Sequence, residues 1–194
     1  TDTRDYLAKS RQDAERKGYA DWLIVDIDAH HVETVSWPEV TSFIEDPVVR
    51  DQAKMYHSER IGAPPYGLNG DLGLRYQDVG GRIPHQSSQR EKVTETDVHR
   101  DVVLTRRAMH GLGVDYMVIF PTPMLFLGMH PQTEMEVFLS RAYNRWLTEK
   151  VLPGDPGMVT LVVLPFNTPV EALKMVEEFA DAWGYWVLCD FYKI

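Results

Sequence analysis

The residues with the clearest chemical potential lie in the run Val25–Glu33, which contains two aspartates, two histidines and one glutamate. Side chains alternate between the two faces of an extended strand, so Asp28 and His30 are expected on one face and His31 on the other. A carboxylate beside a neutral imidazole can bind a divalent cation. The spacing therefore predicts a metal site at Asp28 and His30, with zinc favoured and manganese the second choice. A hydrogen-bonded surface histidine beside an unrelated aspartate is the alternative.

Alternating strands and helices are predicted to position this pair. The apolar, β-branched run 23–28 predicts a buried strand, and similar runs predict strands at 116–120, 159–164 and 185–191. Start signals and helical spacing predict helices beginning near residues 94, 133 and 168, the second of them with a capping box formed by Thr133 and Glu136. This order predicts an α/β fold with a parallel sheet, in which ligand sites gather beyond the carboxyl ends of the strands.

Candidate substrate-binding residues follow the second predicted strand. Phe120 and Thr122 lie at its end, and His130 lies in the loop before the next helix. The apolar residues around them suit an aromatic or unsaturated substrate, although a hydrophobic plug would have the same composition. For His130, the alternative is a loop histidine at the start of a helix. Asp190, at the end of the last predicted strand, is a candidate third ligand or a turn cap, and Cys189 is expected to be a small buried residue.

The chain is expected to form one domain over residues 1–194 with two additions. Residues 1–20 predict a polar helical arm that packs on the body or on a partner subunit. Residues 34–91 contain a possible short helix at 38–44 and then many turn residues, so this excursion is expected to fold over the site. Its candidate pocket walls are Trp37, Tyr56 and Tyr66. His57 and His85 in the excursion, and His99 in the following segment, are expected to lie on the surface.

Three passages together resemble the amidohydrolase-2 family, the relatives of aminocarboxymuconate semialdehyde decarboxylase. VDIDAHHVE resembles the family's first-strand motif, the passage Arg107–Thr122 resembles its second helix-and-strand unit, and Ala142–Leu147 resembles its next helix. The resemblance implies a distorted TIM-like (β/α)₈ barrel with one catalytic metal near the first strand. It places Asp28 and His30 at two metal positions, and it implies C–C or C–N bond chemistry on small carboxylated substrates.

The predicted pattern contains about four of the eight strands of such a barrel. The family's later metal ligand and catalytic aspartate come from strands beyond these, so no catalytic residue is identified. A second copy that completes the barrel, a truncated product without activity, and a longer protein are all open explanations. We expect hydrolysis or non-oxidative decarboxylation, with a non-catalytic half-barrel that acts through association as the alternative. The exposed edge and apolar inner face of a half-barrel favour a homo-oligomer.

Composition argues against several other functions. The net charge of −9 makes a nucleic-acid partner unexpected, and no apolar run approaches the length of a membrane helix. One cysteine and a charged N-terminal segment suit a reducing, cytoplasmic setting. The expected partner is a small-molecule substrate.

Overall fold

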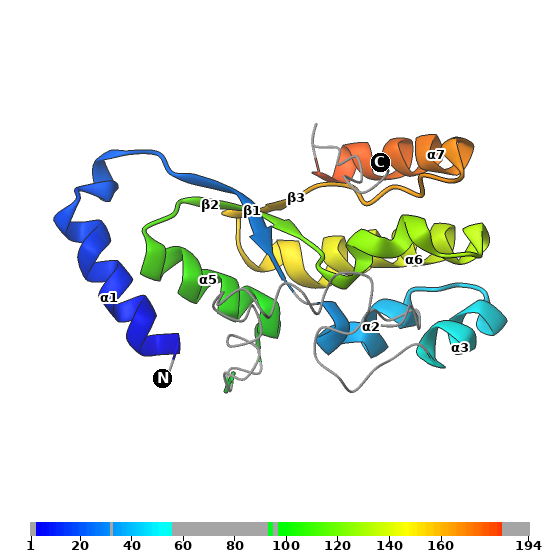
Figure 1. The fold of residues 1–194 in the computed structure, drawn as a ribbon, viewed down its shortest axis with the longest axis horizontal. Helices are drawn as coiled ribbons and strands as arrows, with labels where there is room; N and C mark the ends of the chain where they lie inside the picture. The colour runs from blue at the N-terminus through cyan, green and yellow to red at the C-terminus, as the bar shows by residue number, and fades with distance from the viewer. Residues whose placement is uncertain (1–2, 32, 56–92, 95–96, 184–194) are drawn as a thin grey trace.

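The computed structural model describes residues 3–31, 33–55, 93–94 and 97–183. At its centre is a parallel sheet of three strands, β1 (Val25–His30), β2 (Tyr116–Phe120) and β3 (Met158–Thr160), in the order β1-β2-β3 (Figure 1). The prediction of a mixed α/β fold with a parallel sheet is therefore confirmed. The fourth predicted strand, at residues 185–191, lies outside the described residues.

Helices surround this sheet. Figure 1 shows α5 and α6 together on one side of it, and the packing contacts pair α1 with α5, α2 with α6, and α6 with α7. The bounds of the α-helices are α1 Thr3–Arg16, α2 Trp37–Ser42, α3 Pro47–Met55, α5 Arg100–Leu112, α6 Thr133–Trp146 and α7 Pro169–Trp183. Shorter turns of helix are η1 Tyr19–Asp21, η2 Glu33–Ser36, η4 Pro123–Met129, η5 Leu147–Val151 and η6 Leu152–Gly154.

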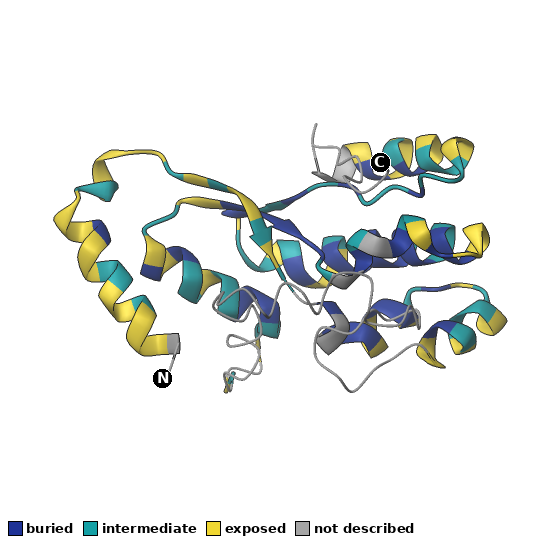
Figure 2. Ribbon diagram, viewed as in Figure 1, coloured by how far each residue is buried: buried dark blue, intermediate teal, exposed yellow. Residues whose placement is uncertain are grey.

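The main core lies between the sheet and the helices. Because side chains alternate along β2, Met117 and Ile119 face this core, whereas Val118 and Phe120 form a small cluster on the opposite face. Figure 2 shows the buried residues concentrated along α6 and β2. The opposite face of the sheet is the one on which the candidate metal ligands are found.

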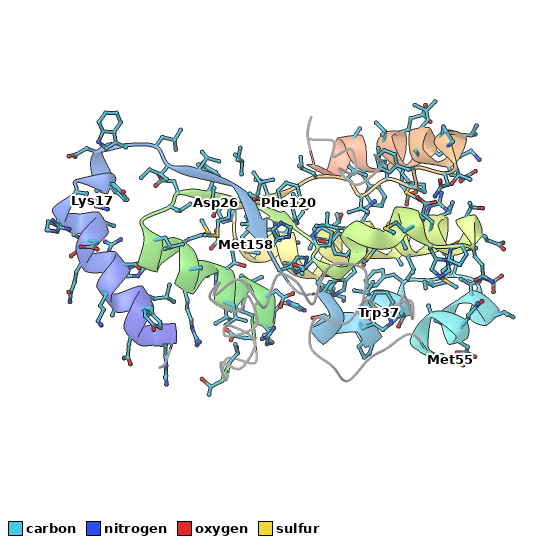
Figure 3. The ribbon with its side chains drawn as sticks, in the orientation of Figure 1. Lys17, Asp26, Trp37, Met55, Phe120 and Met158 are labelled. Atoms are coloured by element: carbon cyan, nitrogen blue, oxygen red, sulfur yellow. The ribbon has the colours of Figure 1, made fainter. Side chains whose placement is uncertain are left out.

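The first strand forms where it was predicted, but the expectation that it is buried is wrong. Leu23 and Ile27 are 74% and 72% exposed, because β1 is the edge strand of the sheet and one of its faces is open among the described residues. Within the excursion, α2 forms near the short helix that was predicted at 38–44. The helix after it, α3, was not predicted. Trp37 is not a pocket wall: it is fully buried in the main core, and its indole donates a hydrogen bond to the Ala53 carbonyl (Figure 3).

The predicted capping box at the start of α6 is also wrong. The N-cap is Gln132, without a side-chain cap hydrogen bond, and Glu136 turns inward instead. Its carboxylate is 1% exposed and accepts hydrogen bonds from the backbone N–H groups of Phe166 and Asn167. These hydrogen bonds, from the segment after β3, satisfy a carboxylate that would be costly to bury without partners.

Candidate metal site

Asp28 and His30 come together at the carboxyl end of β1. The Nε2 atom of His30 lies 3.2 Å from Oδ1 of Asp28. The Asp28 side chain is 82% exposed, and that of His30 is 25% exposed. The expected common face is therefore present despite a register shift between Asp26 and Ala29. The pair lies on the face away from the main core, beside Phe120, whose ring centroid is 5.8 Å from that of His30.

The hydrogen bonding of His30 defines which nitrogen faces Asp28. Nδ1 lies 3.2 Å from the carbonyl oxygen of Pro121, and a carbonyl can only accept, so Nδ1 carries the proton of this contact. In the neutral ring, Nε2 then presents a lone pair to the Asp28 carboxylate. Two acceptors at 3.2 Å repel each other unless a proton or a metal cation lies between them.

This donor set fits a divalent metal ion. Histidines that bind metals through one nitrogen usually donate the other N–H to a carbonyl or carboxylate, as His30 does to Pro121. Asp28 would add a negatively charged oxygen ligand. Within the part of the chain that the structure describes, no group of three or more His, Cys, Asp or Glu side chains is placed to bind one ion. Asp28 and His30 would thus contribute two ligands of the three or four that zinc usually takes.

Thr122 lies beside the pair, whereas His130 makes other contacts. The Thr122 hydroxyl is 3.5 Å from Nδ1 of His30 and donates a hydrogen bond of 2.6 Å to the His31 carbonyl. His130 is buried, its Nδ1 accepts a hydrogen bond from the Gln132 backbone, and burial lowers its pKa. The structure thus brings Asp28, His30, Phe120 and Thr122 together, and it places His130 in the turn before α6.

His31 points to the other side of the sheet, as its position in the strand predicts. Its Nδ1 lies 3.2 Å from a carboxylate oxygen of Asp101, and its Nε2 lies 2.7 Å from the hydroxyl of Tyr143. The ring stacks on Trp146, with centroids 5.9 Å apart and planes 5° apart. These contacts fix the residue that follows the metal-ligand candidate. Asp101, at the start of α5, and Tyr143, within α6, were not identified from the sequence as polar partners.

The network around His31 continues through three helices. His99 caps α5 by accepting a hydrogen bond from the Asp101 backbone, and its Nε2 lies 3.1 Å from the Glu39 carboxylate. Glu39 also accepts a hydrogen bond from the Trp146 indole. The sequence-based assignment of His99 to the surface is wrong, because its side chain is 13% exposed and contacts Trp146 edge-on.

Glu33 is the most deeply buried acid near the site, with no exposed surface. Its two carboxylate oxygens accept hydrogen bonds from the backbone N–H groups of Thr122 at 2.9 Å and Met124 at 2.6 Å. Glu33 therefore ties the segment after β1 to the segment after β2. The only sequence signal for this residue was its place in the VDIDAHHVE motif.

Burial sets the electrostatics of these groups. Burial raises the pKa of Glu33, opposed by the nearby His31 and by the two backbone hydrogen bonds. Burial also acts to raise the pKa of Asp101, but its hydrogen bond with His31 and the charges of His31, His99 and Arg100 outweigh this effect and lower it. The pKa of Tyr143 is raised well above its ordinary value by burial and by the charges of Glu33 and Asp101. Its hydroxyl therefore stays protonated and is not a phenolate.

A cavity of about 160 Å³ lies on the helix side of the sheet, where β1 and β2 face α5. Its polar lining comes from His30, His31, Arg100, Asp101 and Thr105, and Ala29 and Ile119 contribute to its apolar lining. Because His30 also lines it, the cavity adjoins the candidate metal ligand, while His31 and Asp101 connect it to the network around His31.

Comparison with known proteins identifies no family for this chain. No protein-family model matches it, and a search of the curated proteins finds no match.

Proposed function

We propose that this protein is a metal-dependent enzyme of the amidohydrolase type, which hydrolyses or non-oxidatively decarboxylates a small carboxylated substrate. The described sheet would be part of a (β/α)₈ barrel. The observation that carries the proposal is the Asp28–His30 pair at the carboxyl end of β1, in which Nδ1 of His30 faces the Pro121 carbonyl and Nε2 faces Asp28. This is where parallel sheets bind ligands, and these are groups that hold divalent cations.

The chemistry follows from the side chains around the pair. A divalent cation held there supplies Lewis acidity, which polarises a substrate carbonyl or lowers the pKa of a water molecule. Phe120 offers an apolar surface on the same face, which suits the ring or unsaturated body of a substrate. The Thr122 hydroxyl, 3.5 Å from Nδ1 of His30, is a neutral polar group that could orient that substrate. The expected ion is zinc, with manganese the second choice.

The ligand assignment is tested by elemental analysis of protein purified with added zinc and manganese. His30→Ala should lower the metal content because it removes the ligand nitrogen, and Asp28→Asn should weaken metal binding because it removes the negative charge of the carboxylate. His110→Ala and Asp51→Asn are matched controls, since both residues are exposed on helices. Equal metal content in the variants and controls, or no metal in the parent, would refute the assignment.

The reaction class is tested with the same proteins. Parent protein is incubated with a panel of small aromatic and unsaturated carboxylic acids and with their amides. Release of carbon dioxide indicates decarboxylation, and release of amine or ammonia indicates hydrolysis. Activity that disappears in His30→Ala and persists in His110→Ala supports the proposal. Metal binding without either activity on the panel would leave the site as a binding site and contradict the proposed enzyme.

A second function, association without catalysis, is favoured by one observation. Trp22, Leu23, Val25 and Ile27 are between 44% and 74% exposed along the edge strand and the turn before it. Exposed apolar residues beside an unpaired strand edge are typical of protein–protein contacts. Under this alternative, substituting Ile27 would change the oligomeric state. Substituting His30 would change neither the mass of the assembly in solution nor any activity.

A further inference from the structure

The peptide unit between Pro121 and Thr122 joins two of the groups described above. Its carbonyl oxygen lies 3.2 Å from Nδ1 of His30, and its N–H donates a hydrogen bond of 2.9 Å to Oε2 of Glu33. One rigid amide plane therefore lies between a fully buried carboxylate and the imidazole of the candidate metal ligand. The adjacent hydrogen bond from the Met124 N–H to Oε1 fixes the carboxylate in turn.

We propose that Glu33 is a positioning residue, which acts through the Pro121–Thr122 peptide to hold the proton of His30 on Nδ1 and to direct Nε2 toward Asp28. The inference rests on the proposed function for its purpose, because Nε2 is the atom that would bind the metal. Hydrogen bonds in a chain polarise one another, so a carboxylate on the N–H side makes the carbonyl of the same peptide a better acceptor. The arrangement resembles the direct carboxylate–histidine pairs of metal sites, with a peptide inserted between the two groups.

Two other described polar groups near His30 do not account for this orientation. The Thr122 hydroxyl donates to the His31 carbonyl at 2.6 Å and is 3.5 Å from Nδ1, so it is a weaker partner than the Pro121 carbonyl. The Asp28 carboxylate is 82% exposed and competes for the proton from the other side of the ring. Without the bond to Glu33, the Pro121 carbonyl would lose both its polarisation and its fixed direction, and the proton would move toward Nε2.

The chain offers a matched control for Glu33. Glu136 is also a buried carboxylate that accepts hydrogen bonds from backbone N–H groups, but these belong to Phe166 and Asn167, after β3. Glu33→Gln and Glu136→Gln each replace one acceptor oxygen by a donor and should destabilise the protein to a similar degree. Only Glu33→Gln should alter the imidazole of His30.

The test uses nitrogen-15 NMR of the histidine rings in metal-free protein at pH 9, where free imidazole is neutral. The signals of His30 are assigned by their absence in His30→Gln. We expect the parent to carry the His30 proton on Nδ1, and the ratio of Nδ1–H to Nε2–H forms to fall by about fivefold in Glu33→Gln, as expected for the loss of one hydrogen bond. Glu136→Gln should leave this ratio unchanged.

Several results would overturn the inference. If the Nε2–H form of His30 is dominant in the parent, the inference is refuted without any variant. The test therefore stays valid even if Glu33→Gln does not fold. An unchanged ratio in Glu33→Gln, or an equal change in both glutamine variants, would also do so. Because these measurements need no metal, they are independent of the elemental analysis that tests the proposed function. Where the parent does bind zinc, Glu33→Gln should weaken that binding by about tenfold.

Discussion

Removing the hydroxyl of Tyr143 should destabilise the protein although it leaves no cavity. Tyr143→Phe keeps the ring, which is fully buried beside His31 and Trp146, and deletes the 2.7 Å hydrogen bond to Nε2 of His31. The His31 side chain is 10% exposed, so its Nε2 loses its hydrogen-bond partner where water has little access. An unsatisfied buried acceptor costs about 1–3 kcal/mol.

Urea unfolding measures this cost. With a slope of about 2 kcal/mol/M, the midpoint should fall by roughly 0.5–1.5 M while the slope stays constant. Tyr116→Phe is the matched control, because Tyr116 is 43% exposed on β2, and it should change the free energy of unfolding by less than about 0.5 kcal/mol. A Tyr143→Phe midpoint equal to that of the control would refute the reasoning that the network around His31 fixes the end of β1.

Three further outcomes are expected. Gly113→Ala should cost about 1–2 kcal/mol in urea unfolding, because Gly113 ends α5 at a φ of 70° and an added Cβ would lie 2.9 Å from that of Ala14. Burial acts to raise the pKa of Asp155, but the hydrogen bonds from Arg106 and from the Gly157 N–H, together with the charge of Arg106, outweigh it and lower the pKa. The stabilising effect of this carboxylate is therefore present above the unfolded pKa near 4 and lost as pH falls through the lower folded pKa. Asp155→Asn should therefore lose less stability than the parent between pH 5 and pH 2, and an equal loss would contradict this. Ile27→Glu should reduce the mass seen by light scattering if the open face of β1 joins copies of the chain, and a monomeric parent would exclude such assembly.

Most of the helices and strands were readable from the sequence because burial imposes a period on apolar residues, although α3 was missed and β3 covers only Met158–Thr160 where a strand at 159–164 was predicted. Tyr116–Phe120 forms β2 as predicted, and the broad apolar stripe after Thr133 forms α6. The proximity of Asp28 and His30 at the end of β1 was readable for a related reason, since the alternation of a strand places the two side chains together over only two residues. The structure contains no helix, among the residues that it describes, that is long and apolar enough to cross a membrane.

The partners of buried polar groups were not readable. Asp101 lies 70 positions from His31, and Thr122 lies 89 positions from Glu33, so no local pattern connects them. The burial of Trp37 and of Glu136 was likewise not readable from the local sequence. An aromatic residue in an excursion and an acid at a helix start have common surface roles, and only packing across several elements shows that both are buried here.

The binding of one divalent cation by Asp28 and His30 is tested most directly by anomalous X-ray diffraction at the zinc edge. Crystals of the parent soaked in zinc should show a peak about 2.0–2.2 Å from both Nε2 of His30 and a carboxylate oxygen of Asp28. The same soak of His30→Ala crystals should show no peak at that position. Zinc bound only elsewhere in the parent, or an unchanged peak in His30→Ala, would contradict the claim.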